Sequence, residues 1–252
     1  MNKRIFIVAF FAFLFLAGSV YAAIGITELR TEQLKNPLGI DVRQPRLGWH
    51  IESDEQNVIQ TAYHILVASS PELLEQGKGD IWDSGKIESD ASQWITYQGK
   101  TLKCNASYYW KVKIDTNKGA TNWSAPAFWT TGLFNEADWQ GQWIGLDRAA
   151  PGDSETQWSR LAARYLRKEF AVKKDVKRAT VHIAGMGLYE LFINGQRIGN
   201  QVLAPAPTDY RKTILYNTYD VTSLLQTENA IGVTLGNGRF YTMRQNYKPY
   251  KI

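Results

Sequence analysis

Tyr108-Tyr109-Trp110-Lys111-Val112-Lys113-Ile114 is the stretch that decides the fold of this 252-residue chain. Large apolar side chains stand at every second position from Tyr108, and two lysines stand between them. A period of two is typical of a β-strand with one face buried and the other in solvent. The same alternation recurs outward along the chain, in residues 63–67, 180–183, 189–193 and 231–235. Such a chain is predicted to consist mainly of strands.

Turn signals separate these segments, and helical signals are few. Asn194-Gly195 stands between two alternating runs and favours a tight hairpin, because both turn positions need positive φ. Ser70 followed by Pro71 predicts one or two helical turns over residues 71–75. Thr222 precedes a second short turn over residues 223–225. Strands spaced every ~8–15 residues predict an all-β fold made of sandwiches.

A change of composition divides the chain near residues 132–138. An apolar strand ends at Gly132, and the polar run Asn135-Glu136-Ala137-Asp138 follows. We expect a first domain over residues 23–134, which has the size of an immunoglobulin-like or fibronectin type III sandwich. A second domain is expected over residues 135–252. Residues 247–252 have no polar tail, so we expect this second domain to be truncated.

Residues 1–22 have the pattern of a secretory signal peptide. Lys3 and Arg4 form a positive start, an apolar run follows, and small residues lead to a cleavage point after Ala22. The run is shorter than the ~20 residues that span a bilayer. We therefore expect an exported protein, periplasmic or extracellular, with no membrane span after cleavage. An uncleaved membrane anchor is the alternative.

Charge and residue counts exclude several classes of function. Lys and Arg number 29 and Asp and Glu 24, an excess too small and too scattered to predict a nucleic-acid partner. With a single cysteine, Cys104, no internal disulfide can form, and we expect a half-buried, inert thiol. The three histidines are His50, His64 and His182. Because His64 and His182 take polar positions in their strands, we expect them in solvent, and we expect no metal site and no cofactor.

Carboxylates offer no evident catalytic pair. Hydrolysis of a glycosidic bond by two acids requires both to flank that bond. The acids with the most suggestive positions lie in different strands or loops, where roles in turns and caps are expected: Asp83, Glu190, Asp209 and Asp220. No nucleophile elbow, phosphate loop or dinucleotide motif occurs. The residues alone therefore predict no catalytic side chain in this chain.

Nine tryptophans raise the question of sugar binding, because a flat aromatic ring can stack on a pyranose. Four of them lie in apolar stretches and are expected in the core: Trp49, Trp82, Trp110 and Trp129. Trp158 lies in a polar loop, and Phe240-Tyr241 follows a glycine-rich turn. These three residues are the candidate substrate-binding side chains. Packing or an interdomain contact is the alternative for each.

Two ordered series of motifs resemble one family. In the first domain the series comprises residues 36–41, 45–49, 60–68, 81–86, 108–112 and 123–126. In the second it comprises residues 187–195, 207–210, 216–222 and 235–238. Both resemble the N-terminal region of bacterial α-L-rhamnosidases, glycoside hydrolase family 78. The resemblance implies a fibronectin-like sandwich followed by a jelly-roll-like β-sandwich, incomplete in this chain.

The family also implies a reaction. Its enzymes hydrolyse terminal non-reducing α-L-rhamnose from glycosides and polysaccharides with inversion, using two carboxylates and one water. Those carboxylates lie in an (α/α)6 barrel further along the chain, so no catalytic residue carries over to this segment. Some members hold a calcium-dependent rhamnose-binding module between the two domains. The short link from Thr131 to Trp143 leaves no place for it, so no calcium site is expected.

Three functions are open for the segment itself. The first is an inactive accessory scaffold of a rhamnosidase, packed on the missing barrel and serving rhamnose-containing glycans through the parent enzyme. The second is a stand-alone carbohydrate-binding module with an exposed aromatic platform. The third is a cell-surface adhesion or assembly module that uses unpaired strand edges. The ordered motifs favour the first.

Overall fold

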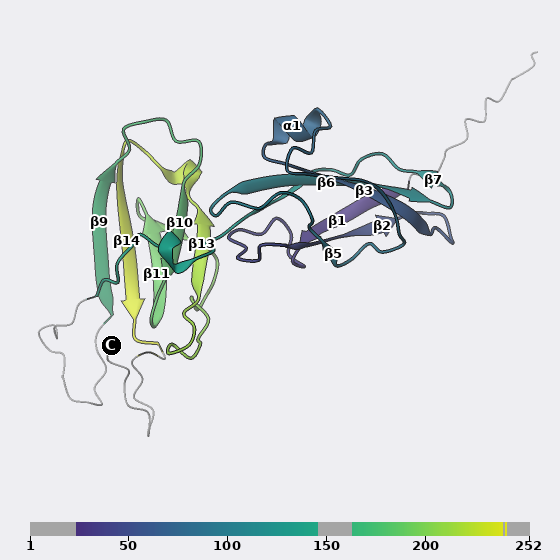
Figure 1. The fold of residues 1–252 in the computed structure, drawn as a ribbon. Helices are drawn as coiled ribbons and strands as arrows, with labels where there is room; N and C mark the ends of the chain where they lie inside the picture. The colour runs from purple at the N-terminus through teal and green to yellow at the C-terminus, as the bar shows by residue number, and fades with distance from the viewer. Residues whose placement is uncertain (1–23, 146–162, 239, 241–252) are drawn as a thin grey trace, which may run out of the picture.

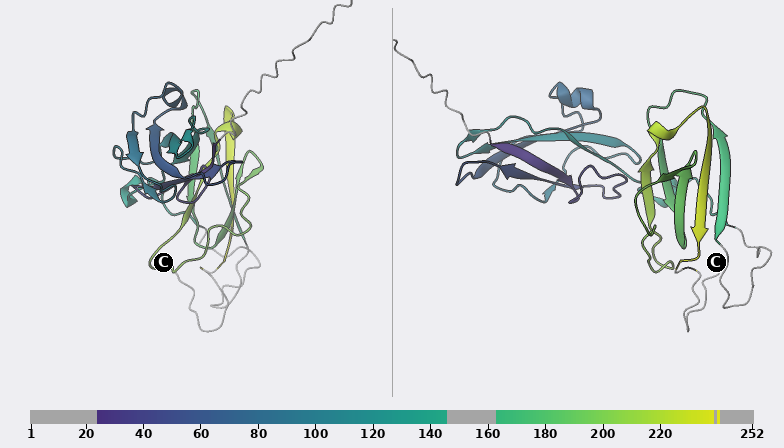
Figure 2. Two further views of the ribbon diagram at one scale, coloured as in Figure 1. Left: turned by 90° about the vertical axis from the view of Figure 1, so that its right-hand side faces the viewer. Right: turned by 180° about the vertical axis from the view of Figure 1, so that it is seen from behind.

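The chain forms two β-sandwiches that lie side by side (Figures 1 and 2). The structure, a computed structural model, describes residues 24–145, 163–238 and 240. The proposed leader, residues 1–22, lies outside the described residues. Strands account for nearly all regular structure in the described ranges, so the all-β prediction is confirmed.

The first sandwich packs a three-stranded sheet against a five-stranded one. The smaller sheet has the order β1 (Gly25–Thr31), β2 (Arg46–Glu52), β5 (Ile95–Thr96). The larger sheet has the order β4 (Trp82–Glu88), β3 (Gln60–Ala68), β6 (Ser107–Thr116), β7 (Gly119–Ala120), and β8 (Ala127–Thr130) also pairs with β6. All pairings between these named strands are antiparallel, as in immunoglobulin-like domains.

Tryptophans fill the space between these two sheets. The alternation in β6 is confirmed, because its apolar positions are all buried and its lysines are not. Trp49, Trp110 and Trp129 are fully buried, as predicted, whereas Trp82 is only partly buried and packs on the edge of the core. Stacked and edge-to-face rings join Tyr108 to Trp129 and Trp49 to Tyr63. Aromatic pairs with this geometry stabilise the fold by more than the burial of their apolar area alone.

One strand of the larger sheet is buried on both faces. Helix α1 (Pro71–Glu75) lies over β3 and covers Leu66 and Ala68 with its own Leu74. Ser70 caps the helix by accepting the Leu73 N–H, and Pro71 stands at its first turn, as predicted. The apolar residues of β3 therefore belong to two clusters: Ile65 and Val67 face the core between the sheets, and Leu66 and Ala68 face helix α1.

The second sandwich packs a four-stranded sheet against a two-stranded one. The larger sheet has the order β12 (Gln196–Ile198), β11 (Leu188–Ile193), β14 (Glu228–Gly236), β9 (Arg164–Ala171). The smaller sheet pairs β10 (Thr180–Ala184) with β13 (Tyr216–Asp220). Between them lie Leu191, Ile193, Tyr189 and Tyr219.

The predicted hairpin joins β11 to β12. Asn194 and Gly195 have φ angles of 51° and 81°, the left-handed region that a two-residue turn of this type requires. The Asn194 side chain donates to Leu224 O and to Asn229 Oδ1, which ties the turn to the start of β14 and to the residues just before it. The turn predicted after Thr222 is a 3-10 helix, η2 (Thr222–Leu224).

Helices are short throughout the described ranges. Besides α1 and η2 there is η1 (Glu136–Asp138), in the link between the sandwiches. None of the described helices has the length and apolar character needed to cross a membrane.

The buried side-chain amide of Gln60 forms hydrogen bonds to a core tryptophan and to the loop that precedes β5. Gln60 is 4% exposed and its Oε1 accepts the Trp49 indole N–H at 3.0 Å. Its Nε2 donates to Ser89 O at 3.0 Å and Ala91 O at 2.8 Å. Each of these partners lacks a bond if the amide is lost, and an unpaired buried polar group costs ~1–3 kcal/mol.

Replacing Gln60 by leucine is expected to lower the free energy of unfolding by ~2–4 kcal/mol, because three polar partners lose their bonds. Urea denaturation followed by tryptophan fluorescence measures this. The exposed Gln98→Leu is the matched control and should leave stability nearly unchanged. Equal stability of the two variants would contradict the role assigned to the Gln60 amide.

Candidate functional site

The four acids considered for catalysis are each held by a neighbour. Glu190 accepts from Arg197 Nε at 3.2 Å, and Asp209 is paired with Arg211 at 3.0 Å. Asp220 accepts from the backbone N–H and the hydroxyl of Thr222. The arginine holds the pKa of Asp209 below its usual range, the opposite of what a general acid requires. These contacts are those of turns and surface ion pairs.

Asp83 and His64 form a pair across β4 and β3. Their Oδ1 and Nε2 atoms are 2.6 Å apart, and the His64 ring also lies edge-on against Trp123 at 5.1 Å. Partial burial opposes ionisation of Asp83, but hydrogen bonds from Gly85 N–H and from His64 prevail and lower its pKa. The expectation that His64 is solvent-exposed was wrong, because Trp123 and Asp83 cover the outer face of β3 at this point.

The structure assigns no metal site to the described ranges. No three His, Cys, Asp or Glu side chains of residues 24–145, 163–238 and 240 gather closely enough to hold an ion. Cys104 is exposed, so the prediction of a half-buried thiol was wrong. It lies in the turn before β6, where Asn105 has φ 47° and donates its N–H to Gly132 O, and this turn leaves the side chain of Cys104 at the surface.

The aromatic candidates for sugar binding have mixed outcomes. Phe240 is half-buried and lies edge-to-face with Tyr210 at 5.8 Å. Trp158 and Tyr241 lie outside the described residues. A role in substrate binding stays a prediction for all three.

The feature that brings distant parts of the chain together is the joint between the sandwiches. On the first sandwich it consists of Gly39 and Gly132, which lie on neighbouring backbone segments joined by an Ile40–Thr131 bridge. On the second it consists of Tyr216 and Thr218, at the start of β13. The Tyr216 hydroxyl accepts the Leu133 N–H at 2.9 Å.

Both glycines are required by close approach. A Cβ at Gly39 would lie 2.6 Å from Thr218 Cβ, and Gly39 also has φ 72°. A Cβ at Gly132 would lie 2.8 Å from Gly39 O and closer still to the Tyr216 hydroxyl. A side chain at either place would force Thr218 or Tyr216 of the second sandwich to move.

Aromatic rings close the joint around Tyr216. Trp139, from the link, lies edge-on to it at 5.2 Å, and His182, from β10, lies edge-on to it at 5.9 Å. His182 Nδ1 is 3.0 Å from Thr218 Oγ1, and its buried Nε2 has no partner among the described residues. The expectation that His182 is in solvent was therefore wrong, since the polar position of β10 faces the joint. Burial and the nearby Arg178 lower the pKa of His182.

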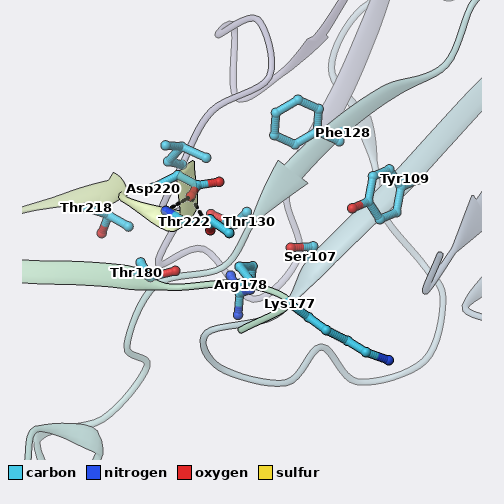
Figure 3. A pocket seen from close by; sticks show the side chains of 11 residues that line it. Ser107, Tyr109, Phe128, Thr130, Lys177, Arg178, Thr180, Thr218, Asp220 and Thr222 are labelled. Atoms are coloured by element: carbon cyan, nitrogen blue, oxygen red, sulfur yellow. Dashed lines mark hydrogen bonds between the residues drawn. The ribbon is translucent and has the colours of Figure 1, made fainter. Parts of the chain in front are cut away.

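A cleft of about 320 Å³ runs beside the joint, with walls from both sandwiches (Figure 3). Its first wall carries Tyr109 and Phe128, and its second carries Thr180, Asp220 and Thr222. Figure 3 shows Lys177 directed away from the other labelled side chains.

Several polar side chains of the cleft are bonded within the protein. Thr130 Oγ1 accepts the Gly39 N–H, Arg178 donates to Asn105 O and Oδ1, and Asp220 accepts from Thr222. The Arg178–Asn105 bonds join the two sandwiches, whereas the other two lie within one sandwich. Side chains satisfied in this way have little capacity left for a ligand, so this part of the cleft is interpreted as an interdomain joint.

Two family models match the chain. One, described as Rha78A-like, N-terminal immunoglobulin domain, matches residues 26–135. The other, the α-L-rhamnosidase N-terminal domain, matches residues 174–251. The chain belongs to the α-L-rhamnosidase family. The resemblance seen in its motifs is confirmed.

Relatives and solved structures agree with this assignment. A curated α-L-rhamnosidase of Formosa agariphila is 38% identical over 229 residues, which cover 84% of this chain and 24% of the relative. The α-L-rhamnosidase structure from Dictyoglumus thermophilum has a TM-score of 0.79 at 40% identity and covers 86% of this chain and 25% of its own. That from Aspergillus terreus has a TM-score of 0.72 at 29% identity and covers 91% and 25%. The chain spans about a quarter of the length of these relatives.

In this α-L-rhamnosidase-family chain, Gly132→Ala is expected to loosen the joint, because the added methyl displaces the Tyr216 hydroxyl from Leu133. Small-angle X-ray scattering should then show a larger maximum dimension, and proteases should cut the link faster. Gly141→Ala is the matched control in the same link, since nothing lies within 4 Å of a Cβ there. Identical scattering of both variants and the parent chain would refute the joint.

Stability of the same rhamnosidase domains should depend on His182. Since its pKa in the fold lies below the ordinary value of 6.5, the unfolded chain takes up the proton first as pH falls. The free energy of unfolding is therefore unaffected by this proton above pH 6.5. It decreases as the pH falls from 6.5 toward the pKa of His182 in the fold. Urea midpoints at about pH 7.5 and about pH 5 should diverge more for the parent chain than for His182→Gln. Parallel pH profiles would contradict this.

Proposed function

We propose that the chain is the N-terminal arm of an exported α-L-rhamnosidase and that its two sandwiches are an accessory scaffold without catalytic residues. The parent enzyme would hydrolyse terminal non-reducing α-L-rhamnose from glycosides and polysaccharides with inversion. The proposed organisation is a leader over residues 1–22, an immunoglobulin-like domain over 23–134 and the rhamnosidase N-terminal domain over 135–252. The observation that carries the proposal is the ordered match of both domains to enzymes about four times longer.

Site chemistry supports a scaffold role for this segment. The four candidate acids are each engaged by a neighbouring arginine, histidine or hydroxyl, and the pKa values of Asp83 and Asp209 are lowered. An inverting hydrolase needs one carboxyl whose pKa is raised and a second one across the bond. The acid and base of the parent enzyme would therefore come from another part of the polypeptide.

Surface side chains of the second sandwich support packing on a further domain. Val202 is 87% exposed and Leu203 67%, next to each other in the loop after β12. Tyr165, on the outer strand β9, is 82% exposed. A catalytic domain that packs on either group would remove it from water, which stabilises by ~25 cal/mol per Å² of apolar surface.

Export is part of the proposal. The charged start, the apolar run and the small residues before Ala23 support a cleaved leader. The mature enzyme would act in the periplasm or outside the cell.

The polypeptide encoded by the complete reading frame is expected to cleave an aryl α-L-rhamnoside and to release rhamnose of inverted anomeric configuration, as followed by NMR. Activity should be found in the periplasmic or secreted fraction. The 252-residue chain alone should release none, and an aryl β-D-glucoside is the control substrate. Hydrolysis by the 252-residue chain, or none by the complete product, would overturn the proposal.

A further inference from the structure

Trp94 is an unusual residue of the first sandwich. Its φ is 61°, in the left-handed region that a bulky side chain occupies at a cost, and it is 54% exposed. It is the last residue before β5. A large apolar ring that is open to water, on a backbone in this region, calls for an explanation other than core packing.

The backbone on each side of Trp94 is fixed to β2. Trp49 N–H donates to Ser92 O at 2.9 Å, and the Gln93 side chain donates to Trp49 O at 2.6 Å. On the other side, Ile95 pairs with Leu47. The chain therefore bulges outward at position 94 between two anchored points and holds its side chain at the surface.

One face of the Trp94 ring is covered by a cation. Arg46 Cζ lies 4.5 Å from the ring centroid. Glu32 fixes that guanidinium through bonds of 2.6 Å to Nη2 and 3.1 Å to Nε, and it also accepts the Arg46 backbone N–H at 2.6 Å. Since Arg46 occupies one face, the exposed area of the ring lies on the opposite face and the edge.

Other surface tryptophans lack this combination. Trp123 is only partly exposed, with Lys111 and Lys113 each 5.1 Å from its centroid and His64 at its edge. Trp143 is 61% exposed, but no ring or cation of the described residues stacks on it. Of the described tryptophans, Trp94 is the one that is more than half exposed and also has a cation over its ring.

We propose that the open face of Trp94 is a non-catalytic platform that binds a pyranose ring of the glycan on which the enzyme acts. The inference rests on the proposed function. The apolar C–H face of the sugar would stack on the indole, and its hydroxyls would meet charged neighbours at the edge. Arg46 Nη1 has no hydrogen bond to another described residue, so it is available to donate. The rigid backing lowers the entropy that binding must otherwise overcome.

The test is affinity electrophoresis of the full chain in gels with and without rhamnogalacturonan. The parent chain is expected to be retarded by the polysaccharide, and Trp94→Gly to bind about tenfold more weakly. The matched control, Trp143→Gly, removes an equally exposed indole without a backing cation and should be retarded like the parent. Absence of retardation, or equal retardation of Trp94→Gly and the parent, would overturn the proposal.

Two further readouts separate binding from folding and from catalysis. Glycine accepts φ 61° without strain, so Trp94→Gly should keep the melting temperature of the parent, and Trp94→Phe should bind with intermediate strength. In the complete enzyme, Trp94→Gly should leave hydrolysis of a small aryl rhamnoside unchanged and slow hydrolysis of the polysaccharide. An equal loss on both substrates would overturn the platform. If the unmodified enzyme does not hydrolyse the aryl rhamnoside, the proposed function is wrong. The electrophoresis result on Trp94 is independent of that outcome.

Discussion

Two positions without side chains let one sandwich rest directly on the backbone of the other. Gly39 and Gly132 leave just enough room for Thr218 and the Tyr216 hydroxyl. At these two positions the contact is made at backbone level, because neither glycine has a side chain to place between the domains. The cleft and the partly buried His182 lie beside this contact. In a longer enzyme such a joint would make the two domains act as one rigid arm.

Much of the fold could be predicted because alternation and turn chemistry are local. The buried face of β6, the Asn194-Gly195 hairpin and the Ser70 cap each depend on residues within a few positions of one another. Three of the four core tryptophans are fully buried, since they lie on strand faces that the sandwich must close. The family could be reached as well, because its motifs keep their order along the chain.

What could not be predicted depends on what covers the outer faces. Alternation separates two faces of a strand but does not say that Trp123 lies over His64 or that the first sandwich lies over His182. Trp94 was missed for a related reason. Its sequence neighbourhood is ordinary, and only the anchored loop and the Glu32–Arg46 pair, far away in sequence, make the ring a fixed surface. Positive φ at a tryptophan has no signal in a single sequence.

The two faces of strand β13 contact different parts of the protein, and this limits which mutations the strand tolerates. Tyr216 and Thr218 point to the first sandwich, while Tyr219 and Val221 point into the core of the second. A strand reverses its faces when its register slips by one residue. Inserting or deleting a single residue between Thr218 and Tyr219 would therefore turn one of the two sets to the wrong face of the strand, and either the joint or the core would lose its side chains. The spacing between positions 216 and 221 should tolerate substitution far better than any change of length.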